Sequence, residues 1–239
     1  MSRIDKMVTV DPERQSRPDD PERDIASEGR PQRAGPLVAF DFDGTLTVRD
    51  SFKAFLRWRI GPSAYWLGMG KLIPSLLAYP FHRNRARLKS AMVRIFLKGL
   101  PRKILEQEAA EFAAVAAPVL LRPDALKAWR RYRLDGARLV IVTASPEQLV
   151  APFARGLGAD LLLATKLDFD AEGRVTGRLD WRNCRSQEKV RRLREAFGQD
   201  IRLTAAYGDT AGDIEMLDLA DEKYMRLFTG KPSGAGGAL

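Results

Sequence analysis

The chain has 239 residues, 45% of them hydrophobic, which is enough for one large domain or a domain that carries an insertion. A single cysteine, Cys184, excludes an internal disulfide and a cysteine-rich zinc site. The net charge of +9 favours partners that carry phosphate groups, such as phosphate esters, nucleic acids or anionic lipids.

The two ends of the chain have the composition of unfolded segments. Residues 1–35 are rich in Arg, Asp, Glu, Pro and Ser and poor in aromatic residues, so we expect a disordered tail. No apolar stretch of the signal-peptide type occurs at the start, so the expected compartment is the cytoplasm. Residues 231–239 are rich in glycine, and we expect a flexible C-terminus.

Between the ends, apolar runs alternate with helical stretches, which predicts an α/β fold with a mostly parallel sheet. Strands are expected at 36–42, 138–143, 159–164, 203–207 and 223–228, and a small hairpin at 166–181. Helices are expected at 124–134, 146–156, 187–197 and 214–220. Residues 36–49 and 119–230 would then form a Rossmann-like, three-layer core, and residues 50–118 an α-helical insertion.

The first motif is Asp-Phe-Asp-Gly-Thr at residues 41–45, directly after the apolar run 37–40. It places two carboxylates, Asp41 and Asp43, at the carboxyl end of a buried strand, where ligands bind in open α/β sheets. One carboxylate can attack while the other handles protons. A surface turn is the simpler alternative. A calcium loop is excluded, because Thr45 and Phe52 occupy positions where that loop needs carboxylate or amide oxygens.

Three further motifs lie beside the other strands. Thr143-Ala-Ser145 follows the second strand, Lys189 lies on the helix before the fourth, and Asp209 and Asp213 follow the fourth. Each has a simpler interpretation alone: a helix cap for Thr143, a solvated lysine for Lys189, and a turn and a cap for the two aspartates. Because parallel strands end at one edge of the sheet, their joint occurrence in this order predicts one site.

These motifs resemble those of the haloacid dehalogenase superfamily of phosphatases over residues 37–228. Within that superfamily, the chain is similar to the subgroup of phosphoserine phosphatase, subfamily IB, which carries a helical C1 cap after the first motif. The stretches 143–147 and 184–189 resemble bacterial membrane-lipid phosphatases of the phosphatidylglycerophosphatase C type.

The resemblance implies roles for the four aspartates. Asp41 would be the nucleophile that forms an aspartyl-phosphate, and Asp43 would be the general acid and base. Mg²⁺ is the implied cofactor, because it prefers oxygen ligands. Its ligands would come from Asp41, Asp209, Asp213 and the backbone carbonyl of Asp43, with Asp213 acting either on metal-bound water or on Lys189.

The resemblance also implies a phosphate-binding set. Thr143 would hydrogen-bond one phosphoryl oxygen, and Lys189 would neutralise another. The backbone amide of Ala144 would complete the cradle, and Ser145 would contribute to substrate binding. Thr143 and Lys189, together with Asp41 and Asp43, form the predicted catalytic group.

Two cap positions bear on the substrate. In phosphoserine phosphatase a cap carboxylate and a cap arginine bind the amino acid. Asp50 occupies the place of the carboxylate, but Val93 occupies the place of the arginine, with Arg94 one residue further on. We therefore expect weakened recognition of phosphoserine, unless Arg94 compensates for the shift.

The cap is basic and apolar. Residues 51–105 contain twelve Lys and Arg residues and no acidic residue. Within them, residues 60–81 carry Lys71 as their only Lys, Arg, Asp or Glu and just reach the length of a spanning helix, yet glycines and prolines interrupt them. We expect a hairpin or interfacial segment that contacts anionic lipid, or else the buried centre of a cap bundle.

The predicted function is a Mg²⁺-dependent phosphomonoester hydrolase. Its substrate would be a small phosphate ester or a phospholipid headgroup phosphate similar to phosphatidylglycerophosphate. The alternatives are phosphoserine phosphatase, a phosphotransferase on the same core, and a membrane-associated regulatory protein without activity. An anionic membrane lipid is a candidate partner, which would place the chain at the inner face of the membrane. No nucleic-acid partner is expected, because no nucleic-acid motif accompanies the positive charge.

Overall fold

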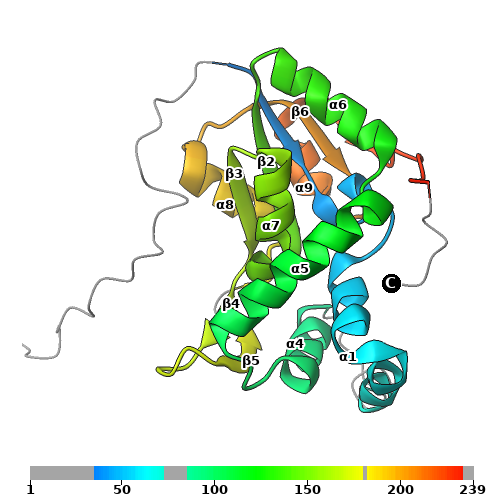
Figure 1. The fold of residues 1–239 in the computed structure, drawn as a ribbon. Helices are drawn as coiled ribbons and strands as arrows, with labels where there is room; N and C mark the ends of the chain where they lie inside the picture. Colours follow the sequence, from blue (N-terminus) through cyan, green and yellow to red (C-terminus); the bar gives the residue numbers. More distant parts are fainter. Residues whose placement is uncertain (1–34, 73–84, 180–181, 234–239) are drawn as a thin grey trace, which may run out of the picture. The chain divides into compact units, whose positions relative to one another are not determined.

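The computed structural model describes residues 35–72, 85–179 and 182–233. The expected tail at 1–35 lies almost wholly outside these residues, as do the last residues of the chain and residues 73–81 of the apolar cap segment. Among the described residues, a five-stranded parallel sheet has the order β3-β2-β1-β6-β7 (Figure 1). Its strands are β1 (Leu37–Phe40), β2 (Arg138–Pro146), β3 (Leu161–Thr165), β6 (Leu203–Gly208) and β7 (Ala220–Met225).

Helices cover both faces of this sheet. Side chains alternate along β1: Val38 and Phe40 pack into one hydrophobic cluster, whereas Leu37 and Ala39 pack into another. The first cluster includes side chains of three helices, α5 (Arg102–Leu120), α6 (Pro123–Leu134) and α7 (Glu147–Leu157). The second includes α8 (Gln187–Phe197) and α9 (Ile214–Leu217). The three layers confirm the predicted Rossmann-like α/β core.

Strand β1 lies in the middle of the sheet, with β2 on one side and β6 on the other. All four of its residues are buried, as expected for a parallel strand with helices on both faces. The ring of Phe40 stacks on that of Tyr207, with centroids 4.5 Å apart. This packing fixes the end of the strand from which Asp41 emerges.

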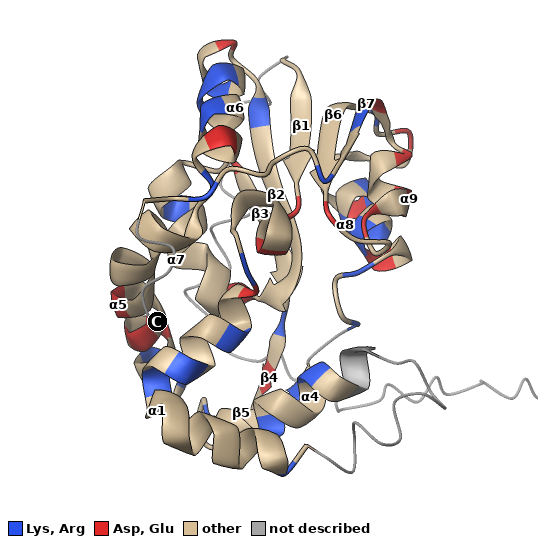
Figure 2. Ribbon diagram, turned by 90° about the vertical axis from the view of Figure 1, so that its right-hand side faces the viewer, with Lys and Arg blue, Asp and Glu red and all other residues tan. Residues whose placement is uncertain are grey.

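The cap elements lie beyond the carboxyl ends of the strands, as Figures 1 and 2 both show. Helix α1 (Ser51–Gly70) bends at Gly61, whose φ is 78°, and packs on α4 (Arg85–Phe96) through Tyr65 and Phe96, with ring centroids 5.8 Å apart. The predicted hairpin is present as β4 (Leu167–Phe169) and β5 (Val175–Leu179).

This hairpin pairs with the cap, which the sequence did not predict. The amide of Gly99 donates to the carbonyl of Val175, and the amide of Arg102 donates to that of Gly173, both at 2.8 Å. The hairpin thereby joins the segment between α4 and α5, although it follows β3 in the chain.

The predicted end of the sheet is displaced by three residues. Strand β7 starts at Ala220 instead of Lys223, and α9 ends at Leu217 instead of Ala220. β7 is an edge strand whose residues Asp221, Glu222 and Lys223 are exposed, so it lacks the apolar run that marks the other strands.

Candidate active site

The first motif lies at the centre of the sheet edge. The amide of Asp41 donates to the carbonyl of Tyr207 at 2.9 Å, which extends the pairing of β1 with β6. The chain then turns through Phe42–Leu46, where Gly44 has a φ of 86°. A Cβ atom at Gly44 would collide with the carboxylate of Asp209. Glycine therefore allows both the turn and the close approach of the first motif to the last.

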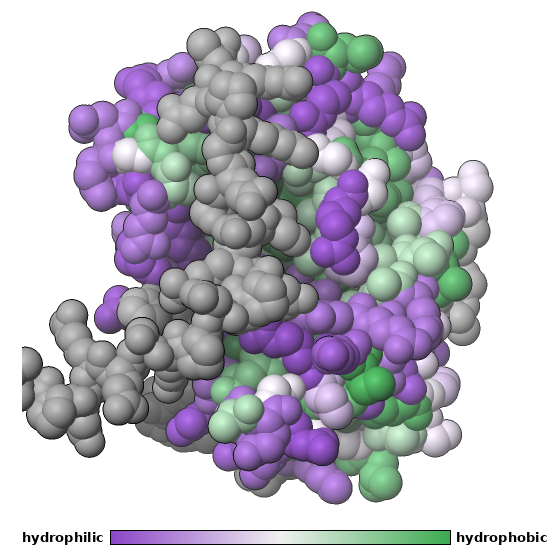
Figure 3. Space-filling model, turned by 60° about the vertical axis from the view of Figure 1, so that its left-hand side comes forward, coloured by the Kyte–Doolittle hydropathy of each residue, from purple (hydrophilic) through white to green (hydrophobic). Residues whose placement is uncertain are grey.

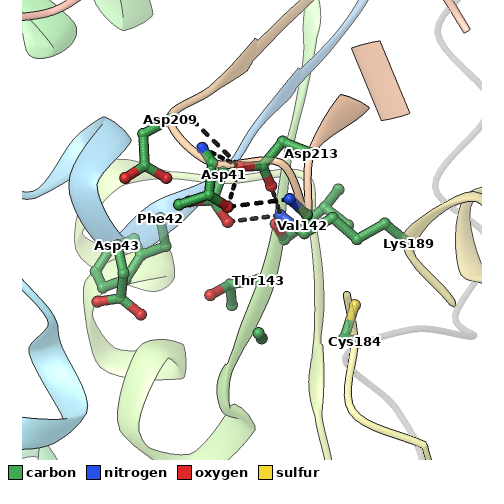
Figure 4. Close-up of polar contacts among 12 residues, drawn as sticks. Asp41, Phe42, Asp43, Val142, Thr143, Cys184, Lys189, Asp209 and Asp213 are labelled. Atoms are coloured by element: carbon green, nitrogen blue, oxygen red, sulfur yellow. Dashed lines mark hydrogen bonds and ion pairs between the residues drawn. The ribbon is translucent and has the colours of Figure 1, made fainter. Parts of the chain in front are cut away.

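The buried ammonium group of Lys189 contacts two other predicted residues, Asp41 and Asp213 (Figure 4). Lys189 Nζ lies 2.6 Å from Asp41 Oδ1, 2.7 Å from Asp213 Oδ1 and 2.6 Å from the carbonyl oxygen of Val142. Lys189 is 2% exposed, so it is not the solvated lysine of the simpler interpretation. Its three N–H donors match these three acceptors.

The two carboxylates share this lysine unequally. The other oxygen of Asp213, Oδ2, accepts from the amides of Asp209 and Thr210 at 3.2 and 2.9 Å, and from the Thr210 hydroxyl at 3.0 Å. Burial opposes the ionisation of Asp213, but Lys189 and the Thr210 hydrogen bonds outweigh it and hold its pKa below the ordinary value. Asp213 is therefore a fixed negative charge.

Asp41 has the opposite balance. Burial raises its pKa to about 7, Lys189 opposes this shift, and the charge of Asp213 adds to it. For Lys189 itself, burial disfavours the charged form, but Asp41 and Asp213 outweigh burial and raise its pKa. The single positive charge of Lys189 balances only one of the two buried carboxylates that it contacts. A further cation near Asp41 would therefore stabilise its ionised form.

Nearby carboxylates could hold a metal ion that supplies this positive charge. Among the described residues, carboxylate oxygens of Asp41, Asp209 and Asp213 lie within 4.8 Å of one another. Opposite ligands of Mg²⁺ are about 4 Å apart, because each bond is about 2.1 Å long, so the oxygen-only set fits this ion. Burial, followed by the charge of Asp213, raises the pKa of Asp209. The carboxylate of Asp43 is outside this group.

Asp43 faces the cap instead. Its Oδ1 accepts from the amide of Ser51, the first residue of α1, at 2.6 Å, and its Oδ2 accepts from the Ser145 hydroxyl at 2.5 Å. Burial and then the charge of Asp50 raise the pKa of Asp43, and the two hydrogen bonds oppose this shift. Its carboxylate lies apart from the Lys189 cluster in Figure 4.

The second motif lies between these two groups. Thr143 is buried, and its Oγ1 accepts from the amide of Ser145 at 3.1 Å. Helix α7 begins only at Glu147, so Thr143 is not its N-terminal cap. The carbonyl of Ala144 accepts from the Thr165 hydroxyl at 2.8 Å. The structure thus brings Thr143, Ala144 and Ser145 to the same edge as Asp41.

The predicted cap residues make other contacts. Asp50 is exposed and caps α1, accepting from the amide of Lys53 at 2.9 Å. Val93 is completely buried in the core, and Arg94 is exposed, with its Cα, Cβ and Cγ atoms beside Gly177 of the hairpin. Arg94 therefore lies on the β4–β5 side of α4.

Two residues at the site were missed by the sequence reasoning. Lys89 on α4 donates from Nζ to the carbonyl of Ala144. Arg226 donates from Nε to the carbonyl of Asp209 at 2.7 Å and holds a positive φ of 55°. Lys89 is one of twelve cap cations without a motif of its own, so no local signal distinguishes it.

Cys184 has a structural environment. Its amide donates to the Thr165 hydroxyl at 3.0 Å, and its thiol lies 3.6 Å from the carbonyl of Leu163. Burial raises the pKa of the thiol to about 11. A thiol in this state is a poor nucleophile at neutral pH.

Comparison with known proteins places these motifs in a wider group. The family model of haloacid dehalogenase-like hydrolases matches residues 38–218. "Protein CicA" of Caulobacter vibrioides is 61% identical over 197 residues, which cover 82% of this chain and 88% of that protein. A "Phosphoserine phosphatase" of Halobacterium salinarum is 31% identical over 189 residues, covering 77% and 82% of the two chains.

The fold also matches solved structures. A protein of unknown function from Bordetella pertussis Tohama I superposes with a TM-score of 0.66 at 22% identity. The match covers 79% of this chain and 88% of that one. At this identity the likeness concerns the fold, and it agrees with the layers described above.

Proposed function

This chain belongs to the haloacid dehalogenase-like hydrolase family, and we propose that it hydrolyses phosphate monoesters through an aspartyl-phosphate on Asp41. The family, the α/β fold and the enzyme class expected from the motifs are confirmed: the chain is a hydrolase of this family, related to phosphoserine phosphatases. The observation that best supports the proposed chemistry is the buried cluster of Asp41, Lys189 and Asp213 at the sheet edge.

The proposed first step uses the two motif aspartates. The Asp41 carboxylate attacks phosphorus, the bond from phosphorus to the alcohol oxygen breaks, and Asp43 gives that oxygen its proton. The raised pKa of Asp43 suits a group that must hold a proton near neutral pH. Lys189 and the Thr143 hydroxyl stabilise the negative charge of the phosphoryl oxygens.

The second step regenerates the enzyme. Asp43, now ionised, takes a proton from water, the water oxygen attacks phosphorus, and inorganic phosphate leaves Asp41 as a free carboxylate. A magnesium ion held by Asp41 and Asp209, with Asp213 beside them, would supply the positive charge that lets a carboxylate approach a phosphate. The backbone carbonyl of Asp43 is the further ligand that the family resemblance suggests.

The nucleophile can be tested with Asp41→Asn. We expect hydrolysis of an aryl phosphate with Mg²⁺ present to fall by roughly 10⁴-fold or more, because an amide cannot form the acyl phosphate. Asp200→Asn, at an exposed position, is the matched control and should retain the wild-type rate. Undiminished turnover by Asp41→Asn would overturn the assignment.

For the substrate we propose a small phosphate ester or a phospholipid headgroup phosphate, with an anionic membrane as the partner surface. The basic composition of residues 51–105 supports this proposal, as do Trp66 and Leu67 on α1, which are 63% and 72% exposed. Among the described residues, no helix is long and apolar enough to cross a bilayer. On the face drawn in Figure 3, hydrophobic residues form small patches among hydrophilic ones.

A vesicle assay tests this partner. The protein should cosediment with anionic vesicles more than with neutral ones, and added salt should weaken the binding. Replacing both Trp66 and Leu67 with Ser should reduce binding, whereas Leu134→Ser, at an exposed apolar position on α6, should leave it unchanged. Equal binding to neutral and anionic vesicles would contradict the proposal.

Phosphoserine is the second candidate substrate, because curated relatives carry the name phosphoserine phosphatase. Arg94, the residue that could compensate for Val93 in binding the amino acid, is exposed beside the hairpin, so recognition of the serine carboxylate would need another cation of the cap. A comparison of turnover on phosphoserine, sugar phosphates and phosphatidylglycerophosphate separates the candidates.

A further inference from the structure

One cation of the cap reaches the catalytic edge of the core. Lys89 lies in the second turn of α4, and its Nζ donates to the carbonyl of Ala144. Ala144 immediately follows Thr143, the residue proposed to bind a phosphoryl oxygen. Helix α4 lies beyond the carboxyl ends of the strands in Figure 2, so this contact spans from the cap to the site.

The charge of Lys89 is left uncompensated at close range. In the part of the chain that the structure describes, Lys189 pairs with two carboxylates within 2.7 Å, whereas Lys89 has none within 4.0 Å. Lys89 is partly buried, and its one acceptor among the described residues, a carbonyl, uses one of three N–H donors. Two donors and a full positive charge therefore remain for another group, because an ammonium in such surroundings gains from an anion.

The contacts of residues 144 and 145 show on which side of the site Lys89 lies: Lys89 donates to the carbonyl of Ala144, and the hydroxyl of the next residue, Ser145, donates to Asp43 Oδ2. Burial lowers the pKa of Lys89, and the charge of Asp43 is the strongest opposing influence, ahead of those of Asp50 and Asp41. Asp43 is the residue proposed to protonate the leaving oxygen. Lys89 is accordingly on the side of the departing alcohol, while Lys189 is on the side of the nucleophile and the metal ligands.

We propose that Lys89 binds a second anionic group, a carboxylate or a phosphate, on the alcohol portion of the substrate. The inference rests on the proposed phosphatase function and names the class of ester: one whose alcohol carries an oxyanion near the bond that breaks. Lys89 takes the role considered for Arg94 in the sequence, from a position five residues earlier on α4.

A binding experiment tests this with pairs of ligands that differ in the second anion. Phosphoserine and phosphoethanolamine differ by a carboxylate, and glycerol 1,3-bisphosphate and glycerol 1-phosphate differ by a phosphate. Their dissociation constants are measured by calorimetry with Mg²⁺ in the Asp41→Asn background, so that no ligand is consumed. The doubly anionic member of at least one pair should bind more tightly, and which pair responds identifies the carboxylate or the phosphate as the source.

Two substitutions separate charge from structure. Lys89→Gln keeps an N–H donor for the Ala144 carbonyl but removes the charge, whereas Lys89→Arg keeps the charge. Lys89→Gln should weaken binding of the doubly anionic ligand by about 10-fold to 100-fold, the usual value of a charge-assisted hydrogen bond, and change its partner ligand less than about 3-fold. Lys89→Arg should restore most of the loss, and Lys98→Gln, at an exposed cap lysine, should have no effect.

Each other outcome overturns the proposal. Equal binding of both members of both pairs shows that no second anion is recognised, and so does a failure of every ligand to bind. Equal losses for both members in Lys89→Gln would show that Lys89 acts on the common phosphate or on folding. The phosphatase function is judged separately by aryl phosphate hydrolysis in wild type, because an aryl phosphate lacks a second anion.

Discussion

Asp41 and Asp43 are two residues apart, yet they belong to opposite halves of the site. The core half surrounds Asp41 with charged groups from α8 and the β6–α9 loop, namely Lys189, Asp209 and Asp213. The other half, called the cap half because it faces the cap, gives Asp43 neutral donors among the described residues: a hydroxyl from Ser145 of strand β2 and an amide from Ser51 of helix α1. The core half thus carries permanent charges, whereas the cap half leaves its nearby cation, Lys89, to the substrate.

This difference follows from what each half must do. Phosphoryl chemistry needs the same charges for every ester, so they can be fixed by buried ion pairs on the rigid sheet edge. The alcohol differs from one ester to another, and in the proposed function its recognition falls to the cap. The comparison can be sharpened by three substitutions or conditions, given from the largest expected effect to the smallest.

The largest effect is expected from Lys189→Met in the core half. Removing one partner of a buried ion pair costs about 3–5 kcal/mol of unfolding free energy, because Asp41 and Asp213 are left without their cation. Urea denaturation at pH 8 without added Mg²⁺, where Asp41 is ionised, measures this loss. Lys166→Met, at an exposed lysine, is the control and should change stability little. Equal stability of the two variants would show that Lys189 does not balance the buried charges of Asp41 and Asp213.

A smaller effect is expected from Ser145→Ala in the cap half. The variant loses the hydrogen bond to Asp43 Oδ2, so the proposed acid is less well positioned and kcat should fall by about 10-fold. Ser145→Thr keeps a hydroxyl and should retain more of the activity. Steady-state kinetics on an alkyl phosphate measure both. An unchanged kcat in Ser145→Ala would show that Ser51 alone positions Asp43.

The smallest effect concerns pH and the metal. The pKa of Asp41 is about 7 in the folded protein and 3.8 as its ordinary value. Between these two pH values, the metal-free folded state therefore keeps a proton on Asp41 that the unfolded state has lost. Its contribution to stability is therefore full below 3.8 and is lost as the pH rises through 7. Mg²⁺ must displace this proton at pH 6 but not at pH 8.

Thermal unfolding with and without Mg²⁺ checks this. The metal should raise the unfolding midpoint more at pH 8 than at pH 6, by on the order of 3 °C. Asp200→Asn should show the same difference as wild type, because that carboxylate is exposed and outside the cluster. A larger shift at pH 6 would mean that Asp41 does not exchange its proton for the metal.

The core half was predictable from sequence because its signals are local. An apolar run followed by Asp-x-Asp-Gly indicates a strand and a turn, and the rule that parallel strands end at one edge brings Thr143, Lys189 and Asp209 together. β7 was misplaced because an exposed edge strand has no apolar run. A helical insertion was also expected, from the helical pattern of residues 50–118 and from the family resemblance, and α1, α4 and α5 lie there.

The cap half was predictable only in part, because its side chains are placed by helix packing. Whether Lys89 or Arg94 faces the site depends on how α4 is rotated, and the contacts of Tyr65 with Phe96 and of Gly177 with Arg94 set that rotation. Neither contact has a sequence signature. The Ser51 amide, a backbone group, could not be singled out at all.

The hairpin β4–β5 has one more consequence. Its backbone hydrogen bonds with Gly99, Leu100 and Arg102 connect the inserted segment to the rest of the chain at a third place besides its two ends. A shortened protein made by joining residue 49 to residue 119 would therefore strip partners from Gly173 and Val175 and expose a new strand edge. The insertion is not a detachable module, and chimaeras that exchange it should exchange the hairpin with it.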